Sequence, residues 1–211
     1  MKKFFSEKHF ENLLKISSPQ LRDWYKKEVE YLKKLNKNSK ILDVGCGFGR
    51  HMEILAPFSN EVVGVDNNKD MIAKAKIDLK GVKNIKLLLQ DATKLDLENN
   101  SFDYVICMSN TFGNFPELKL KVLSEMKRVC KKEGKIIISV YSDNAEKIRK
   151  KDYEKLGLTI TKIEDGVIYI KEGIITEEFS KKKLKDLFDE VGLKSKIIAL
   201  NDISYLCELE K

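Results

Sequence analysis

The sequence ILDVGCGFGR, residues 41–50, joins an apolar segment to a glycine-rich turn and then to the start of a predicted helix. Its glycines are Gly45, Gly47 and Gly49. Glycine allows a tight turn at such positions and lets a ligand approach the backbone closely. The free amide groups at the start of the following helix favour a negatively charged group, such as a carboxylate. The stretch therefore predicts a ligand-binding turn after a strand of an α/β fold.

The spacing of these glycines distinguishes the turn from two other nucleotide-binding turns. A nicotinamide site reads GxGxxG, whereas this turn reads GxGxG and continues with Arg50. No Gly-Lys-Ser or Gly-Lys-Thr follows, so the turn is not a phosphate-binding loop. Asp43 stands inside the predicted strand, two residues before the first glycine. Its carboxylate can accept hydrogen bonds from the glycine turn or from an ammonium group.

Short apolar strands alternate with amphipathic helices on both sides of this turn. The predicted strands are 40–44, 61–65, 85–89, 104–108 and 135–141, and the predicted helices between them are 50–58, 69–80 and 117–130. This alternation is typical of a parallel sheet that is covered on both faces. With right-handed crossovers it becomes a doubly wound sheet.

The pattern changes at both ends of this region. Residues 19–35 read as a helix with a stripe of apolar positions, namely Leu21, Trp24, Tyr25, Val29 and Leu32. After Tyr141 we expect a helix at 144–156, a hairpin at 158–171 that turns at 164–166, a helix at 180–191, and strands at 195–200 and 204–209. The last two strands should pair antiparallel, because no helix separates them.

Acidic residues follow two further strands. Asp66 ends the strand in VVGVD, and a carboxylate there can bind both hydroxyls of a ribose. Asp91 follows the strand in LLLQDA, where it could accept a hydrogen bond from an adenine amine. Taken singly, each acid is also a common turn residue. The strand in FDYVICMSN opens into a loop that contains Asn110.

The succession LDVGCGFG, VVGVD, QDA, FDYVIC and EGKIIISV resembles the class I S-adenosylmethionine-dependent methyltransferases over residues 38–141. The resemblance implies a Rossmann-like α/β fold: a doubly wound, seven-stranded, mostly parallel sheet with one antiparallel strand and helices on both faces. It further implies an S-adenosylmethionine cofactor. A helix and a hairpin are inserted after the fifth strand. In this superfamily such additions often cover the substrate, so we expect 143–176 to be a substrate lid.

By the same resemblance, the glycine turn borders the methionine part of the cofactor, Asp66 binds the ribose, and Asp91 and Ala92 bind adenine. The full set of expected cofactor-binding residues is Tyr25, Asp43, Gly45, Cys46, Gly47, Gly49, Asp66, Asn67, Met71, Asp91, Ala92 and Met108. Plain core packing is an alternative for Met71. For Tyr25 and Trp24 the alternatives are a lid over the cofactor and simple helix packing. His51 is expected at the surface or as a helix cap.

Length and composition limit the class of protein. The 211 residues are expected to form one domain, in which 1–36 is an N-terminal helical lid segment. Lys2 and Lys3 are not followed by an uninterrupted apolar run, and no run is long enough to span a membrane. The four cysteines form no CxxC pair, which favours reduced thiols in a cytoplasmic protein and argues against a structural zinc site.

The resemblance implies a methyltransferase, and the expected lid at 143–176 favours a small or medium-sized acceptor. The net charge of +7 leaves a nucleic-acid partner open, but lysines interspersed with acids favour a solvated surface. One alternative is therefore an RNA or protein methyltransferase that uses Lys181, Lys182, Lys183 and Lys185; another, less favoured, is a non-catalytic cofactor-binding protein. We assign no catalytic residue and no oligomeric state. Asn110, Tyr141 and Tyr205 are candidate pocket residues near predicted strand ends.

Overall fold

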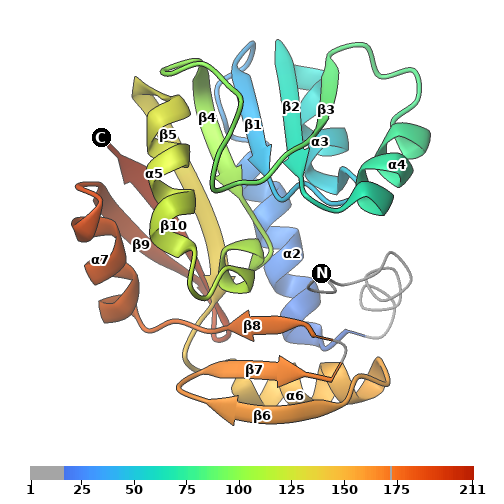
Figure 1. The fold of residues 1–211 in the computed structure, drawn as a ribbon, viewed down its shortest axis with the longest axis vertical. Helices are drawn as coiled ribbons and strands as arrows, with labels where there is room; N and C mark the ends of the chain where they lie inside the picture. The colour runs from blue at the N-terminus through green and yellow to red at the C-terminus, as the bar shows by residue number, and fades with distance from the viewer. Residues whose placement is uncertain (1–16, 172) are drawn as a thin grey trace.

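The computed structural model describes residues 17–171 and 173–211. A seven-stranded sheet with the order β3-β2-β1-β4-β5-β10-β9 forms its centre (Figure 1). Its strands are β1 (Lys40–Val44), β2 (Glu61–Asp66), β3 (Ile85–Leu89), β4 (Phe102–Cys107), β5 (Cys130–Tyr141), β9 (Lys194–Asn201) and β10 (Ser204–Glu210). Strands β1 to β5 pair parallel, while β10 runs antiparallel to both β5 and β9. The predicted fold class, including one antiparallel strand, is confirmed, and this strand, β10, lies next to the edge of the sheet.

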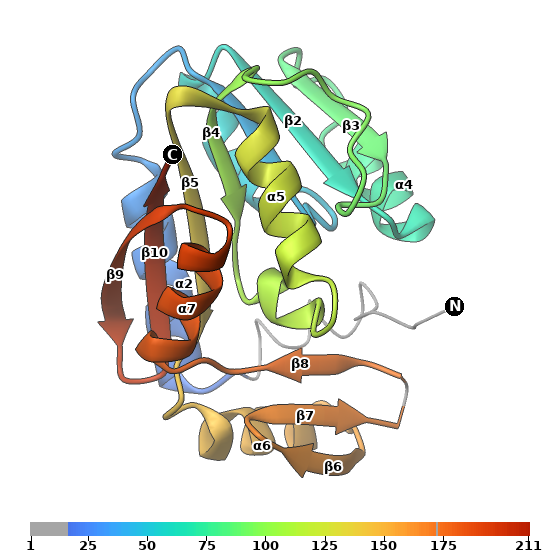
Figure 2. The ribbon, with the colours of Figure 1, turned by 60° about the vertical axis from the view of Figure 1, so that its left-hand side comes forward.

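Helices cover both faces of this sheet (Figure 2). They are α2 (Pro19–Leu32), α3 (Arg50–Leu55), α4 (Lys69–Asp78), α5 (Lys119–Val129) and α7 (Lys181–Glu190). Apolar residues of α5 and α7 pack in one core cluster with Leu42 and Val44 of β1, whereas α2, α3 and α4 pack in another with Ile41. Successive β1 side chains therefore enter opposite cores, as expected of a strand buried on both faces.

The boundaries differ from the predicted ones for local reasons. The helix predicted at 50–58 divides into α3 and a short 3-10 helix, Ala56–Phe58, where Pro57 removes a backbone donor. Strand β5 begins at Cys130, directly after α5, and is longer than predicted. Of the predicted N-terminal lid 1–36, residues 1–16 lie outside the described residues.

The inserted segment forms a layer of its own below the sheet in Figure 1. It consists of α6 (Glu146–Lys155) and a three-stranded antiparallel sheet made of β6 (Ile160–Glu164), β7 (Val167–Ile170) and β8 (Ile175–Glu177). The predicted hairpin is present, with Asp165 and Gly166 both at positive φ in its turn. Strand β8 was not predicted, because three residues are too few to show a periodic pattern.

Arg149 of α6 is fully buried and holds the insertion together. Its Nη1 donates to Glu178 Oε2 at 3.0 Å and to the Gly166 carbonyl at 3.2 Å. Its Nη2 donates to the Thr176 carbonyl at 2.5 Å, and the guanidinium lies 4.9 Å from the centre of the Tyr141 ring. This one side chain therefore links α6, the β6–β7 turn, β8 and the end of β5.

We expect Arg149→Gln to lower the free energy of unfolding by about 3–5 kcal/mol, because it leaves the Glu178 carboxylate buried without a cation. The control is Lys150→Gln on the same helix, where the exposed pair with Glu146 at 3.0 Å should be worth less than about 0.5 kcal/mol. Urea unfolding monitored by circular dichroism measures both changes. Equal losses in the two variants would contradict the buried clamp.

Candidate active site

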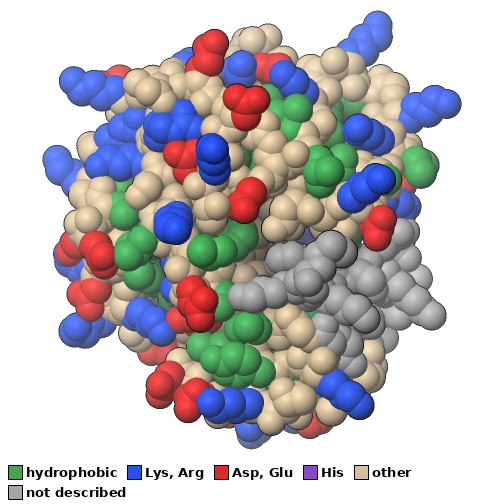
Figure 3. All heavy atoms as spheres, in the orientation of Figure 1, with side chains coloured by type: hydrophobic (Ala, Val, Ile, Leu, Met, Phe, Trp, Pro, Cys, Tyr) green, Lys and Arg blue, Asp and Glu red, His purple; other side chains and the backbone are tan. Residues whose placement is uncertain are grey.

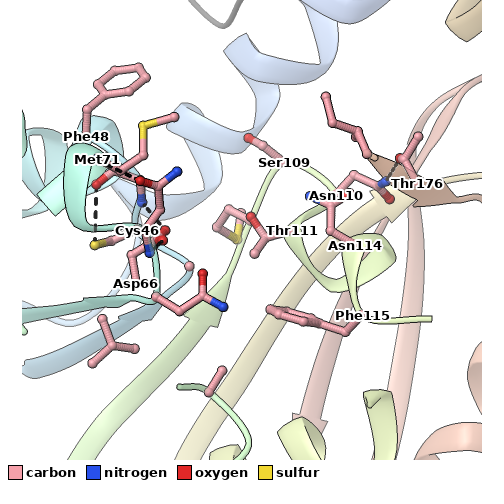
Figure 4. A pocket seen from close by; sticks show the side chains of 18 of the residues that line it. Cys46, Phe48, Asp66, Met71, Ser109, Asn110, Thr111, Asn114, Phe115 and Thr176 are labelled. Carbon is pink, nitrogen blue, oxygen red and sulfur yellow. Dashed lines mark hydrogen bonds between the residues drawn. The ribbon is translucent and has the colours of Figure 1, made fainter. Parts of the chain in front are cut away.

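A cavity opens at the carboxyl ends of β1, β2, β4 and β5 (Figure 4). What we call the glycine-loop wall consists of Gly45, Cys46, Gly47, Phe48, Val65, Asp66, Asn67, Asn68, Met71, Gln90 and Ala92. What we call the β8 wall consists of Asn110, Asn114, Phe115, Pro116, Tyr141, Tyr153, Gly173, Ile174, Ile175 and Thr176. The remaining lining residues are Tyr25, Arg50, His51, Met108, Ser109 and Thr111.

The order of the strands explains where this cavity lies. From β1 the chain proceeds outward to β2 and β3, and then returns to the other side of β1 as β4. The connections after β1 and after β4 therefore diverge, which leaves a crevice at the carboxyl ends of these two strands. The glycine turn enters this crevice from β1, and Ser109 and Asn110 enter it from β4.

The three glycines of the turn have different surroundings. Gly45 has φ +71°, and a Cβ built there would lie 2.2 Å from Thr111 Cγ2. Gly47 has φ +54°, and a Cβ there would meet nothing within 4 Å, so this position faces open space. Gly49 differs from both, because it packs against Leu79 and does not line the cavity. Of the three glycines, the first two therefore border the cavity.

Asp66 fixes the turn from the neighbouring strand. Its Oδ2 accepts a hydrogen bond from the Gly47 amide at 2.9 Å, and its Oδ1 accepts one from the Asn68 amide at 2.8 Å. Burial raises the pKa of the Asp66 carboxyl, against these backbone donors. The expected neighbours Asn67, Met71, Ala92 and Met108 line the cavity as well, as does Cys46.

Asp43 lies below the turn and outside the cavity lining. The backbone donors of the turn go elsewhere, because the Gly45 and Cys46 amides bond to the Val65 carbonyl at 2.8 and 3.0 Å. The Gly45 and Cys46 amides therefore do not donate to Asp43, as the sequence had suggested they could. Its Oδ2 is buried without a partner, and burial raises the pKa of this carboxyl to about 7, against the attraction of Arg50.

Asp91 is also absent from the cavity lining. Its Oδ1 accepts hydrogen bonds from the amide and the hydroxyl of Thr93, both at 2.8 Å, so this carboxylate closes a turn on the surface. The preceding residue, Gln90, lines the cavity in its place. Strand β3 ends at Leu89, as predicted, and of the two residues that follow it only Gln90 lines the cavity, because successive side chains point in different directions.

A buried carboxylate that sequence reasoning missed organises the cavity from α2. Glu28 is fully buried; its Oε1 accepts from the Ser109 amide at 3.0 Å and from Ser139 Oγ, and its Oε2 accepts from Ser109 Oγ at 2.8 Å. Arg50 Nη2 lies 3.4 Å from Oε2 and His51 Nε2 lies 3.5 Å from it. Burial acts to raise the pKa of the Glu28 carboxyl, but its hydrogen bond with His51 and the nearby Arg50 hold that pKa below the usual range.

The signal for Glu28 was present in the sequence. The buried side of α2 consists of Leu21, Trp24, Tyr25, Glu28 and Leu32, so an acid occupies a position of the apolar stripe. The predicted stripe contained Val29 instead, which is only half-buried. An acid at helical spacing within a buried stripe indicates a partnered carboxylate, because an unpaired buried charge is costly.

Two more residues around Glu28 line the cavity. The Arg50 guanidinium lies 4.6 Å from the centre of the Tyr25 ring, so Tyr25 contacts the cavity side of α3. His51, expected at the surface or as a helix cap, is buried and lines the cavity. Burial lowers the pKa of His51, although Glu28 acts in the opposite direction.

Two of the three candidate pocket residues line the cavity. Asn110 and Tyr141 line the cavity. Tyr205 does not; its hydroxyl donates to Asp143 Oδ1 at 3.1 Å, which links the start of β10 to the segment that follows β5. Among residues 17–171 and 173–211, no group of three or more His, Cys, Asp or Glu side chains is arranged to hold a metal ion.

Comparisons with known proteins assign the chain to a family. A model of a methyltransferase domain matches residues 35–192. The chain belongs to the class I S-adenosylmethionine-dependent methyltransferases. A curated relative, the demethylmenaquinone methyltransferase of Staphylococcus saprophyticus, is 30% identical over 193 residues, which are 85% of this chain and 80% of the relative.

Solved structures share the fold of this methyltransferase. The PH0226 protein of Pyrococcus horikoshii is 26% identical, with a TM-score of 0.74 and coverage of 98% of this chain and 99% of that one. An S-adenosylmethionine-dependent methyltransferase of Aquifex aeolicus, 20% identical, shares the fold with a TM-score of 0.67 and 98% coverage of both chains. As a member of this family, the enzyme uses S-adenosylmethionine as its methyl donor.

The cavity fits this donor on two structural observations. The open space at Gly47 leaves room for a ligand against the backbone of the turn. Asp66 presents a carboxylate held only by backbone amides, which leaves lone pairs for hydroxyl donors of a ribose.

The pKa of Asp43 leads to a pH-dependent stability. In the unfolded chain this carboxyl has a pKa of about 3.9, so the folded methyltransferase holds the proton more tightly up to about pH 7. The contribution is favourable below pH ~4 and is lost as the pH rises through about 7. Between about pH 5 and pH 8 we expect the native enzyme to lose roughly 2–3 kcal/mol more stability than Asp43→Asn.

Urea unfolding of both proteins across this pH range measures the difference. Asp43→Asn is the reference for the native enzyme, because it retains every other titrating group. If the free energies of unfolding of the two proteins change equally with pH, Asp43 is ionised throughout this range in the folded enzyme, and the prediction is wrong.

Proposed function

We propose that this methyltransferase acts on a small, uncharged acceptor that binds between the donor and the β8 wall. The observation that carries the proposal is the composition of that wall. Among the described residues that line it there is no charged side chain, and Phe115, Tyr153, Ile174 and Ile175 supply apolar surface. Gly173 to Thr176 come from the insertion, so the cavity is bounded by the segment 143–176 that we regard as a substrate lid.

The predicted hairpin supports this lid without touching the cavity. Ile168 and Ile170 of β7 pack with Tyr153, Leu158 and Ile174 in a separate apolar cluster. None of the β6 and β7 residues is among the cavity-lining residues that the structure describes. The lining strand is β8, with Tyr153 from α6 beside it, so the hairpin acts as the backing of β8.

On the glycine-loop wall we propose the donor site. Gly45, Cys46 and Gly47 would border the methionine part, and Asp66 would bind the ribose hydroxyls. Asn67, Met71 and Ala92 would line the adenosine, and Gln90 takes the position at the adenine that sequence reasoning gave to Asp91. The contacts of Arg50 with Tyr25 and Glu28 place a cation beside the turn. A cation there would favour the carboxylate of the donor's methionine part.

The donor carries the reactive methyl group on a sulfonium and supplies the driving force for an in-line displacement. The chain positions the two reactants and removes water from them. Burial of Tyr141, Met108 and Ile174 keeps this region apolar, so a neutral nucleophile is held without competing solvent. We assign no general base to the reaction.

The curated relative supports an apolar acceptor, because its name describes methylation of demethylmenaquinone. A quinol ring is uncharged and flat, which suits a wall of aromatic and aliphatic side chains. We therefore propose ring compounds of this kind as the first acceptors to test.

The lysine-rich surface gives little support to an RNA or protein acceptor. Lys182 pairs with Asp186 at 2.8 Å, Lys185 with Asp189 at 2.5 Å and Lys183 with Glu177 at 2.5 Å. On the face shown in Figure 3, basic and acidic side chains are interspersed, with no continuous basic stripe. Within the described residues no helix is long and apolar enough to cross a membrane.

We expect Asp66→Ala to weaken binding of S-adenosylhomocysteine by at least about tenfold, because each bond to a charged group is worth roughly 1.5–3 kcal/mol. Asp91→Ala is the matched control, since it removes an equivalent carboxylate that points at Thr93, and should leave affinity within about threefold. Isothermal calorimetry measures both. If Asp91→Ala loses more affinity for S-adenosylhomocysteine than Asp66→Ala does, Asp91 binds the adenine as the sequence predicted.

The acceptor class is tested with labelled S-adenosylmethionine. We expect label to appear in reduced demethylmenaquinone analogues or in related uncharged ring compounds, and not in total RNA or a protein extract. Labelling of RNA that falls steeply as salt rises would instead support the RNA alternative.

A further inference from the structure

Asn114 lines the cavity and carries a buried polar atom without a partner. Its Oδ1 is buried and has no hydrogen-bond partner. Three other buried side-chain atoms of the described chain share this property, in Trp24, Asp43 and Arg149, but none of these residues lines the cavity. Buried polar atoms are nearly always bonded, so an exception beside a ligand cavity indicates a partner that the ligand supplies.

A second asparagine on the same turn shows the contrast. Asn110 Oδ1 accepts from the Tyr141 amide at 3.0 Å, and its Nδ2 donates to Thr176 Oγ1 at 2.9 Å. Both ends of this carboxamide are used to hold the turn against β5 and β8. Asn110 therefore has a structural role, which Asn114 does not share.

The turn that carries Asn114 is held firmly in place. It forms a 3-10 helix, Thr111–Asn114, after the left-handed residues Ser109 and Asn110. A Cβ at Gly113 would lie 2.6 Å from the Glu177 carbonyl of β8, so the turn packs directly on that strand. Because its backbone is fixed from both sides, the Asn114 side chain is held ready for a ligand.

The surroundings indicate what kind of ligand it meets. Figure 4 shows Asn114 and Phe115 on the side of the cavity opposite Asp66 and Met71. The neighbouring Phe115, Pro116, Ile174 and Ile175 offer apolar surface and no charge. A lone carbonyl oxygen in such a wall recognises one hydrogen-bond donor on an otherwise apolar body.

We propose that Asn114 orients the methyl acceptor by accepting a hydrogen bond from its hydroxyl or amine group, and that the acceptor is an uncharged ring compound with such a donor. This inference rests on the proposed function, whose acceptor it specifies. Asn114 is a specificity-determining residue: a compound of the same shape without the donor leaves Oδ1 unpaired and binds less well.

The test compares naphthol with its methyl ether, which keeps the ring and lacks the donor. Binding of each is measured by calorimetry in the presence of S-adenosylhomocysteine. In the native enzyme we expect naphthol to bind about tenfold more tightly than the ether. In Asn114→Leu this preference should vanish, whereas Asn114→Asp, which keeps an acceptor oxygen, should retain it.

The stability of the variant provides a second readout, because a structural role for Asn114 predicts a different result. Replacing an unpartnered buried oxygen by an apolar group of similar shape is neutral or stabilising. We therefore expect Asn114→Leu to unfold at the same urea concentration as the native enzyme or a higher one, with unchanged affinity for S-adenosylhomocysteine. Asn144→Leu, the same change at an exposed residue outside the cavity lining, should alter neither stability nor the preference for naphthol.

The outcomes separate this inference from the function on which it rests. If neither compound binds the native enzyme, and no uncharged ring compound receives label, the proposed acceptor class is wrong and the inference falls with it. If both compounds bind and Asn114→Leu keeps the preference, or if Leu and Asp lose it alike, only the role of Asn114 is overturned. A loss of stability in Asn114→Leu with an unchanged preference would likewise assign the residue to the fold.

Discussion

Strand β1 is hydrogen-bonded on both sides, to β2 along Lys40–Val44 and to β4 along Ile41–Asp43. Both pairings are parallel, so three strands end at the same edge of the sheet. Because the chain leaves β1 in one direction and returns as β4 on the other side, the loops at this edge diverge. The glycine turn, Asp66 and the Ser109–Asn110 turn meet only as a result of this pairing.

Two buried charged groups then fix the sides of the opening. Glu28 brings α2 onto the ends of β4 and β5 through Ser109 and Ser139, and it carries Arg50 with it. Arg149 binds the insertion to the end of β5 through Tyr141. Removing either partner would leave an opposite charge buried, and for this reason such groups hold their surroundings in one arrangement.

The two walls of the cavity differ in chemistry. The glycine-loop wall presents backbone amides and the Asp66 carboxylate, which suit a donor with hydroxyl and charged groups. The β8 wall presents aromatic and aliphatic side chains with single carboxamides between them. Under the proposed function, a polar donor and an apolar acceptor would bind side by side, and the apolar β8 wall would keep water away from the acceptor.

The sequence by itself determined the fold class and most of the glycine-loop wall, because apolar period, glycine spacing and strand-ending acids are local properties of the chain. It also determined the antiparallel end of the sheet, since no helix separates the last two strands. Only the tertiary structure decided which residue of the pair Gln90–Asp91 faces the cavity, because a shift of one residue reverses a side chain. It alone paired Glu28 with Ser109, formed β8 from three residues, and left Asn114 without a partner, since each depends on contacts between segments far apart in the chain.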